Sequence, residues 1–405
     1  MQLLNYERDK THLSNYRWVI LLLLWLLYAC FGIVSRAIFP LVTPILNDLS
    51  LIYSQMGFIL GSWQLTYIVI ALVAGSIIDR WGVRKSLFAG AIIIGLSSSL
   101  RYFANDFTTL LIAVALFGVG GPMISIGGPK AISSWFSGPG RGTAIGIYTS
   151  GNWIGGLLAL ALTNSLVMPL VGNDWKQAFV VYGMITFGVG LLWMLCARET
   201  ESGETPQRMA IIDVFRNLAM LHNVRIVLTM GLLAFAISHG FSSWLPKILE
   251  INGMSGPQAG FAASITIAAG IPSILILPSV VPSRYRGRTM ATLSILTAVN
   301  IILVMQISGV ALLIGLAVLG FVSAPFMSLL LLILMDSPGV ETRHMGSAGG
   351  MFYCVAEIGG FAGPFLMGVL VDLTGTFMAG ALFLAGLCAA IAALTCFLTP
   401  YQEAA

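Results

Sequence analysis

Long apolar segments, each bounded by charged or polar residues, recur along the whole chain. Ser54–Ile78 and Ser86–Leu100 contain no charged residue, and only 9% of all residues are charged. Because about 20 consecutive apolar residues cross the hydrocarbon core of a bilayer, such segments predict transmembrane helices. A soluble domain carries about 25% charged residues, so this composition excludes a soluble enzyme.

The apolar segments predict an all-α integral membrane protein with twelve transmembrane helices in two six-helix halves. They cover roughly residues 17–46, 53–78, 84–103, 108–135, 142–169, 175–197, 223–249, 257–282, 288–307, 310–335, 345–371 and 375–399. A polar segment at 198–222 is predicted as a cytoplasmic linker, in which Ile211–Leu221 can form an amphipathic surface helix. The expected domains are therefore an N-terminal half at 1–197, the linker at 198–222 and a C-terminal half at 223–405.

Lysine and arginine are distributed unevenly between the two sides of the predicted membrane. With both termini in the cytoplasm, three (Arg101, Lys176 and Lys247) fall on the outer side and fifteen on the cytoplasmic side. The fifteen are Arg8, Lys10, Arg17, Arg80, Arg84, Lys85, Arg141, Arg198, Arg208, Arg216, Arg225, Arg284, Arg286, Arg288 and Arg343. Cytoplasmic loops carry the excess of positive charge, so the count predicts a multi-pass protein of the plasma (inner) membrane with both termini cytoplasmic. Arg101, which closes the third segment, is expected to extend its charge to the outer interface.

Several classes of function lack their sequence features. Basic residues are spread over loops rather than gathered in a patch, so no nucleic-acid partner is expected. The tract Gly118–Gly128 lacks the Lys-Ser/Thr ending of a P-loop and is expected to pack and bend helices rather than bind a nucleotide. The five cysteines have no metal-ligand spacing and are expected to be free thiols, so neither a metal nor a cofactor is predicted. No small-residue cleavage site follows the first apolar run, so no cleaved signal peptide is expected.

The two predicted halves share an internal repeat. At an offset of 203, Val34–Ala37 matches Ile237–Gly240, Gln55–Phe58 matches Gln258–Phe261, and Pro122 matches Pro325. At an offset of 204, Arg80 matches Arg284, Arg84 matches Arg288, and Ile154–Gly156 matches Ile358–Gly360. Internal repeats are typical of secondary transporters, so the sequence predicts duplicated, pseudo-symmetric halves.

A charged turn connects the second and third apolar segments. It reads Gly75-Ser76-Ile77-Ile78-Asp79-Arg80-Trp81-Gly82-Val83-Arg84-Lys85. Gly75 is expected to let two helices approach closely, and Gly82 to permit a tight turn. Asp79 falls at a helix C-terminus, where the helix dipole disfavours an anion, so a cationic partner is expected from Arg80, Arg84 or a neighbouring loop. The plainer alternative is a positive cytoplasmic loop with no further role.

This turn resembles the loop between helices 2 and 3 of the major facilitator superfamily (MFS). Gly75, Asp79, Arg80, Gly82, Arg84 and Lys85 match the family pattern, and Val83 departs from it. Trp135-Phe136 followed by Arg141-Gly142 is similar to the family's loop between helices 4 and 5, while Arg36-Ala37-Ile38-Phe39-Pro40 and Trp244-Leu245-Pro246 resemble its anion:cation symporter and cyanate-type permease groups. The resemblance implies transport by alternating access, a central cavity lined by helices 1, 4, 7 and 10, and a conformational gate formed by the six matching residues of the turn.

Arg36 and His239 occupy equivalent positions in the two halves, inside predicted spans 1 and 7. A cation within a membrane span usually faces a cavity or a partner, and a guanidinium can hold a carboxylate through two hydrogen bonds. An imidazole can donate to an anion or carry a proton near neutral pH. Both residues are therefore predicted to bind substrate, and His239 also to take part in proton coupling. The alternatives are an Arg36 side chain that reaches the outer interface and a His239 that only packs.

Glu357 is the one carboxylate deep in a predicted helix, which suits proton coupling; the alternative is a structural hydrogen bond or salt bridge. Further candidates for substrate binding are Tyr28, Gln64, Tyr67, Asn152 and Tyr353, with Trp153 and Asn300 considered beside them, although most such residues in spans serve packing. Lys130 is predicted to anchor the inner end of span 4 at the interface, with an inner-gate role as the alternative. Asp336 and Arg343 flank the loop between spans 10 and 11 and are expected to form gate or loop pairs.

Together these residues predict a secondary active transporter, not an enzyme, that takes up a small organic anion (a monocarboxylate or sugar acid) with H⁺. The protein is expected to lie in the lipid bilayer as a monomer. An alternative substrate is a cationic or zwitterionic amine in an aromatic cavity, against which Arg36 argues. A non-transporting membrane receptor and a channel are the alternatives from other classes; the duplicated halves argue against the receptor, and no ring of identical subunits is indicated.

Overall fold

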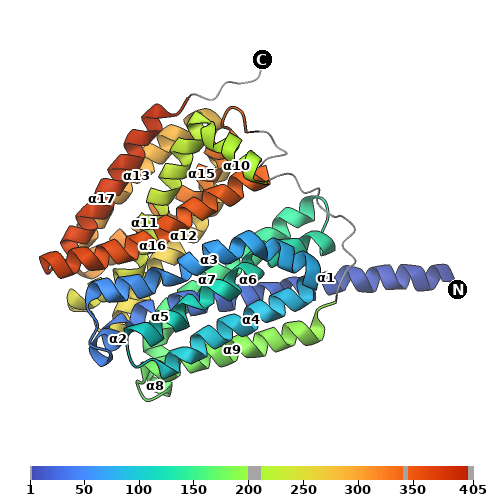
Figure 1. The fold of residues 1–405 in the computed structure, drawn as a ribbon, viewed down its shortest axis with the longest axis horizontal. Coiled ribbons are helices and arrows are strands. Elements are labelled where there is room, and N and C mark those ends of the chain that lie inside the picture. The colour runs from blue at the N-terminus through green and yellow to red at the C-terminus, as the bar shows by residue number, and fades with distance from the viewer. Residues whose placement is uncertain (1, 199–210, 341–344, 400–405) are drawn as a thin grey trace. The chain divides into compact units, whose positions relative to one another are not determined.

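The computed structural model describes residues 2–198, 211–340 and 345–399 (Figure 1). These residues form helices and no strand, and twelve segments among them are long and apolar enough to cross a membrane. The segments begin and end within a few residues of the predicted limits, which confirms the all-α, twelve-span architecture. Residues 199–210 of the predicted linker and Arg343 lie outside the described ranges.

The first six spans are built from α1 to α9. Their bounds are α1 (Gln2–Arg36), α2 (Val42–Asp48), α3 (Tyr53–Trp81), α4 (Val83–Leu100), α5 (Phe107–Ala115), α6 (Phe117–Trp135), α7 (Pro139–Leu162), α8 (Met168–Leu170) and α9 (Trp175–Cys196). A short 3₁₀ segment at Phe39–Leu41 lies within span 1, another at Arg101–Phe103 ends span 3, and a π segment at Thr163–Val167 lies within span 5. Figure 1 shows α4 and α9 side by side, as their contacts require.

The last six spans are built from α11 to α17. Their bounds, with the short helix that precedes them, are α10 (Ile211–Met220), α11 (His222–Ile251), α12 (Gly256–Val280), α13 (Arg286–Val304), α14 (Gly309–Ser323), α15 (Phe326–Met335), α16 (Met345–Thr374) and α17 (Phe377–Leu394). Short 3₁₀ segments occupy Ser283–Tyr285 and Thr395–Phe397. The helix α10 agrees with the amphipathic segment predicted at Ile211–Leu221.

The fourth span of each half consists of two helices. In the first half α5 ends at Ala115 and α6 begins at Phe117, five residues before Pro122. In the second half α14 ends at Ser323, and α15 begins directly after Pro325. Proline cannot donate a backbone hydrogen bond and crowds the preceding turn, so a helix bends or breaks near it. The interruption therefore recurs close to the two prolines that the repeat pairs.

Side-chain caps begin several of the spans. Asp106 accepts a hydrogen bond from the Thr109 amide at 2.8 Å at the start of α5, and the Ser255 amide donates to Gln258 Oε1 at 3.1 Å before α12. Such bonds satisfy groups at a helix N-terminus that have no partner within the helix. The bonds from Thr109 also hold the pKa of the Asp106 carboxyl below its usual range. These caps lie in the polar breaks between apolar segments, where the sequence predicts helix starts.

Glycines bring the first and fifth spans of each half into backbone contact. A Cβ at Gly155 in α7 would overlap the carbonyl oxygen of Ala29 in α1, and one at Gly359 in α16 would overlap that of Leu232 in α11. The two pairs are equivalent in the repeat, because the glycines lie 204 residues apart and their partners 203. The same contact therefore occurs in both halves. In α6, a Cβ at Gly120 would lie 2.7 Å from the Gly90 carbonyl oxygen of α4, which agrees with the packing role expected for Gly118–Gly128.

The described residues divide into two compact units. Unit 1 contains those within 1–38, 66–159 and 167–204, and unit 2 contains those within 39–65, 160–166 and 205–405. The start of α3 thus belongs to the same unit as α11 and α16. The functional domains expected at 1–197 and 223–405 stay a prediction. All five cysteines are free thiols, as expected.

Candidate substrate site and gate

Arg36 is the last residue of α1, and its side chain lies half-buried against α7 in unit 1. Its Nη1 donates to Asn152 Oδ1 at 2.9 Å and lies 3.4 Å from the Asn152 carbonyl oxygen. The guanidinium carbon is 5.9 Å from the centroid of the Trp153 ring. A Cβ at Gly156 would lie 2.5 Å from Arg36 Cδ, so the glycine leaves the space that the side chain occupies. A single stretch of α7 therefore fixes the guanidinium, and two candidate site residues, Arg36 and Asn152, are in direct contact.

The charge of Arg36 has no carboxylate partner in the part of the chain that the structure describes. Ion pairs elsewhere include those of Lys130 with Asp79 and of Arg286 with Asp336. Asn152 is uncharged, so its amide oxygen orients the guanidinium without cancelling the charge. A guanidinium has five N–H donors, and Asn152 takes those of one nitrogen. Arg36 can therefore still present a planar pair of donors to an oxyanion.

Two tyrosines predicted as site residues are half-buried in unit 1. The Tyr28 ring stacks on that of Tyr148, with centroids 4.4 Å apart and planes at 5°. Tyr28 is also close enough to Arg36 for the two groups to interact electrostatically. Tyr67 in α3 shares a hydrogen bond of 2.8 Å with Ser125 Oγ in α6. The structure thus places Tyr28 near Arg36, whereas the contact of Tyr67 joins two helices.

In unit 2, Gln64 of α3 lies between α11 and α16. Its Nε2 is 3.1 Å from His239 Nδ1 and donates to the Gly360 carbonyl oxygen at 3.4 Å. Gln64 is fully buried and His239 half-buried. The rings of Trp63 and Phe235 lie 6.1 and 5.2 Å from the imidazole, centroid to centroid. Two more candidates, Gln64 and His239, are therefore in direct contact within an aromatic enclosure.

Glu357 faces the same glycine of α16. A Cβ at Gly360 would lie 3.1 Å from Glu357 Oε2 and 3.4 Å from Gln64 Nε2. Glu357 is only 8% exposed, and its Oε2 has no hydrogen-bond partner in the described part of the chain. Neither a salt bridge nor a structural hydrogen bond, the alternatives weighed from the sequence, therefore occupies that oxygen. Tyr353, one turn earlier on α16, is exposed, and its ring centroid lies 6.4 Å from that of Phe235.

The expectation that Arg101 extends to the outer interface is wrong. Its side chain is 1% exposed, its Nη1 donates to the Val34 carbonyl oxygen at 3.4 Å, and its guanidinium carbon lies 4.7 Å from the Phe179 ring centroid. The last carbonyls of a helix lack amide partners and carry its negative dipole end, so a buried cation is favourable there. An arginine at the end of an apolar segment can turn inward or outward, and no pattern in the sequence distinguishes the two.

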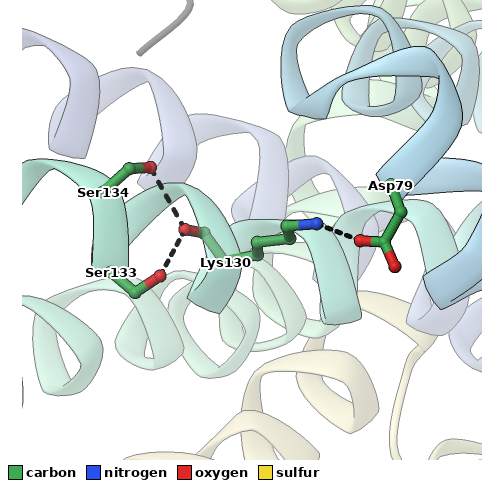
Figure 2. Close-up of polar contacts among 4 residues, drawn as sticks. All are labelled: Asp79, Lys130, Ser133 and Ser134. Atoms are coloured by element: carbon green, nitrogen blue, oxygen red, sulfur yellow. Dashed lines mark hydrogen bonds and ion pairs between the residues drawn. The ribbon is translucent and has the colours of Figure 1, made fainter. Parts of the chain in front are cut away.

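The turn at 75–85 forms an ion pair that the sequence did not identify. Gly82 has a φ of +81° and is the N-cap of α4, which confirms the tight turn. Asp79 pairs with Lys130 of α6 rather than with Arg80 or Arg84 (Figure 2). Figure 2 also shows the Lys130 carbonyl oxygen accepting bonds from the Ser133 and Ser134 hydroxyls. Lys130 therefore does more than anchor α6 at the interface, since it links α6 to the end of α3.

The other members of the turn have different surroundings. Arg84 Nε donates to the Met194 carbonyl oxygen at 3.1 Å, near the C-terminus of α9, and Arg80 and Lys85 are exposed. The close helix approach expected at Gly75 is wrong, because a Cβ there would meet no heavy atom of the described structure within 4 Å. In unit 2, Asp336 pairs with Arg286 of α13; Arg343, the other residue expected at that loop, lies outside the described ranges.

A further contact in unit 2 was not predicted. The Asp372 carboxylate, near the end of α16, accepts bonds from the backbone amides of Tyr53 and Ser54 at 2.9 and 2.8 Å. These amides begin α3, where an anion is favoured by the helix dipole. A Cβ at Gly57 would overlap the Pro364 carbonyl oxygen, so the two helices stay close beyond the cap. The start of α3 is thus tied to the end of α16 by charge and by backbone packing.

Comparison with known sequences identifies transport proteins. A family model described as Major Facilitator Superfamily matches residues 24–364. The chain is 28% identical over 387 residues to the hexuronate transporter of Bacillus subtilis (strain 168), covering 89% of each chain. It is 22% identical over 426 residues to the probable galactarate/D-glucarate transporter GudP of Escherichia coli (strain K12), covering 94% of this chain and 93% of the relative.

Two solved structures share the fold. The nucleoside transporter NupG superposes with a TM-score of 0.77 at 14% identity, covering 94% of this chain and 100% of that one. A bacterial homolog to the human lysosomal transporter Spinster, in an inward-facing and occupied conformation, superposes with a TM-score of 0.71 at 18% identity, covering 95% and 94%. At these identities the likeness concerns the arrangement of helices alone.

Proposed function

The chain belongs to the major facilitator superfamily of multi-pass membrane transport proteins, and from this premise we propose that it takes up a small organic anion by proton-coupled alternating access. The substrate class is a sugar acid or another small carboxylate. Two relatives named as transporters of hexuronate and of galactarate and D-glucarate support an organic anion as the substrate.

The observation that carries the proposal is the guanidinium of Arg36. It lies at the end of a membrane span, is oriented by Asn152 and has no carboxylate partner in the described structure. An intramembrane charge is costly unless it serves a site or a partner, and an arginine suits a planar carboxylate. Arg36 would hold the carboxylate of the substrate, with Tyr28 beside it and Asn152 fixing its orientation. Tyr67 and Tyr353 remain candidates for contacts with the rest of the substrate.

The coupled proton would be carried by His239 and Glu357. The repeat gives His239 the position that Arg36 has in the first half, and Glu357 lies in the helix that packs on α11. A carboxylate within a span that has no structural partner is typical of proton pathways. Gln64, in contact with His239, belongs to this group through its hydrogen bond.

The charged turn at 75–85 would act as the conformational gate, with Lys130 as an added member. Gly82 shapes the turn, Asp79 pairs with Lys130, and Arg84 holds the end of α9. Arg80, Lys85 and Gly75 also match the family pattern but make no comparable contact among the described residues. Such links favour one conformer over another, so breaking them should change the population of states rather than remove the substrate site. The excess of lysine and arginine on one side supports cytoplasmic termini and residence in the plasma (inner) membrane, where the protein would act as a monomer.

The test is uptake by purified protein in liposomes with and without an inward proton gradient. The substrates are galacturonate, glucuronate and glucarate, with a quaternary amine as the alternative. We expect carboxylate uptake driven by the gradient and lost in Arg36→Ala, since a hydrogen bond to a charged group contributes about 1.5–3 kcal/mol, or about tenfold to over a hundredfold in affinity. Arg36→Lys keeps the charge without the planar pair of donors and should recover only part of the uptake.

The matched control is Arg216→Ala, which removes an exposed arginine of α10. It should transport as the unaltered protein does. A thermal-shift assay provides a second reading, because a ligand at a hundred times its dissociation constant stabilises by about 2.7 kcal/mol. Stabilisation by the amine alone, unchanged in Arg36→Ala, would contradict the anion proposal and favour amine transport.

A further inference from the structure

The Arg36 site has an equivalent in the second half with different chemistry. The repeat pairs Arg36 with His239, Gly156 with Gly360 and, at the same offset of 204 as the glycines, Trp153 with Glu357. In unit 1 the Arg36 side chain lies over Gly156. In unit 2 the side chains of Glu357 and Gln64 lie over Gly360, and Gln64 contacts His239. Gly156 and Gly360 directly follow Gly155 and Gly359, the glycines of the two helix contacts. Each half thus has a polar side chain next to its own helix contact.

The second copy is unsuited to an anion. At the positions where the first copy has a guanidinium and a neutral tryptophan, the second has an imidazole and a carboxylate. A buried carboxylate would repel a second carboxylate brought close to it. The two copies therefore differ in the sign of the charge that they can accept.

Two buried oxygens in this copy have no donor in the described structure. They are Oε2 of Glu357 and Oε1 of Gln64, on residues that are 8% and 0% exposed. Both atoms are acceptors, and a buried acceptor without a donor is destabilising. A carboxyl group gains a donor when it binds a proton, and the two side chains lie against the same residue, Gly360. A proton on Glu357 would give Oε2 a hydrogen to donate, and Gln64 Oε1 is a buried acceptor without a donor in the described structure.

We propose that Glu357, Gln64 and His239 form one proton-binding site, the second-half equivalent of the Arg36 anion site. In one state Glu357 carries the proton on Oε2 and donates it to Gln64 Oε1, while Gln64 Nε2 donates to the neutral His239 at Nδ1. The role of this proton in transport rests on the proposed function, whereas the existence of the site does not.

A second state follows from turning the Gln64 amide. The proton then resides on His239 Nδ1, which donates to Gln64 Oε1, and Gln64 Nε2 donates to the ionised Glu357. One proton leaves the carboxyl group and one arrives on the imidazole, so the charges become Glu⁻ and His⁺. The turned amide no longer donates to the Gly360 carbonyl oxygen, a bond that now joins α3 to α16. The position of the proton is thereby linked to the contact between these helices.

The two groups that can exchange a proton in this site, Glu357 and His239, come from α16 and α11. Tyr353 and Cys354 of α16 interact electrostatically with Glu357, and His239 of α11 contacts Gln64. The segment of α3 packed here, 53–65, contains no charged residue. A hard metal cation would take about six or more oxygen ligands, whereas two oxygens lack donors here, so the site suits a proton better than a metal ion.

Infrared difference spectroscopy of the whole purified protein, recorded between high and low pH without substrate, tests the site. A protonated carboxyl group gives a C=O stretching band that an ionised one lacks. We expect this band in the unaltered protein, its loss in Glu357→Gln, and its displacement to higher frequency in Gln64→Leu, which removes the hydrogen-bond acceptor. The control Cys396→Ser, at an exposed cysteine of the segment Thr395–Phe397, should keep the band unchanged.

The result that would overturn the inference is a band that persists in Glu357→Gln or is indifferent to Gln64→Leu. A spectrum that responds to Na⁺ at constant pH, and not to pH, would overturn it as well. Transport separates this inference from the proposed function. If liposomes accumulate no organic anion under a proton gradient, the proposed function is refuted, and the infrared band still decides whether the proton-binding site exists. If uptake is driven by the gradient but the band persists in Glu357→Gln, the proton-binding site alone is refuted.

Discussion

Arg101 donates from Nη1 to the carbonyl oxygen of Val34, two residues before Arg36 in α1, at a distance of 3.4 Å. The guanidinium also packs on the Phe179 ring, 4.7 Å from its centroid. The end of α1 is therefore joined to the ends of two other helices of unit 1. Because Arg36 is the last residue of α1, this buried contact supports the backbone from which the candidate site residue extends.

Replacement of Arg101 by methionine tests that support. Arg101→Met keeps an apolar stem but leaves the Val34 carbonyl without its donor, so we expect the free energy of unfolding to fall by about 1–3 kcal/mol. We also expect weaker binding of carboxylates, because the backbone from which the Arg36 side chain extends is then held less firmly. Thermal melting without ligand measures the first effect and ligand-dependent shifts the second. Tyr102→Phe, a change at the exposed neighbour, should behave as the unaltered protein does; melting of Arg101→Met at the same temperature would refute the role.

Substrate binding should weaken more when Asn152 is replaced by aspartate than when it is truncated to alanine. Asn152→Asp places a negative charge at the position 2.9 Å from Arg36 Nη1, so the guanidinium would be neutralised in an ion pair. Substrate would then compete with an internal anion, and we expect its affinity to fall further than in Asn152→Ala, by about tenfold or more. Titration of the purified protein with galacturonate measures both affinities. Equal losses in the two variants would argue that Asn152 acts through packing alone.

The Asp79–Lys130 pair should affect transport more than stability. The two side chains are 48% and 35% exposed, and such surface pairs contribute about 0–1 kcal/mol. Asp79→Lys or Lys130→Asp alone should lower the uptake rate with little change in melting temperature. The double exchange restores opposite charges and should recover a large part of the rate. Ser134→Ala serves as the control, because its hydroxyl contacts only carbonyl oxygens of α6. Failure of the double exchange to exceed both single variants would show that charge pairing is not the relevant property.

Asp372 should protect the first amides of α3 from exchange with solvent. It accepts hydrogen bonds from Tyr53 and Ser54, so Asp372→Ala leaves two amides without acceptors. Loss of a cap of this kind costs about 0.5–2 kcal/mol. Hydrogen–deuterium exchange followed by mass spectrometry should show faster exchange in peptides that cover the start of α3. Thr374→Ala removes a polar group from the same end of α16 and should leave that exchange unchanged.

The spans, the duplication of the halves and the family could be predicted because they depend on composition and on local patterns. Apolar length sets each membrane helix, and the repeat pairs Pro122 with Pro325 and Gly155 with Gly359, although the helix interruptions and the glycine contacts at these residues became visible only in the structure. Gly82 is another local case, since its positive φ follows from the turn that the sequence predicts.

The partners of the candidate residues could not be predicted in the same way. Asp79 and Lys130 lie 51 residues apart, and Gln64 and His239 lie 175 apart on helices with no sequence relation to each other. Such pairs depend on how helices rotate when they pack. The prediction for Arg101 was wrong for a related reason. Its position at the end of an apolar segment was clear, but the neighbouring helices decide the direction of its side chain.

The glycine contacts to Ala29 and Leu232 leave no space for any side chain at Gly155 or Gly359. In a library of all single replacements, both of these positions, one in each half, should therefore reject even alanine regardless of the substrate offered. Such intolerance would resemble that of a binding residue in any screen that reads only growth or uptake. Laboratory evolution toward a new substrate should leave these two positions fixed, and its accepted changes should gather on the polar groups above the neighbouring glycines, Gly156 and Gly360.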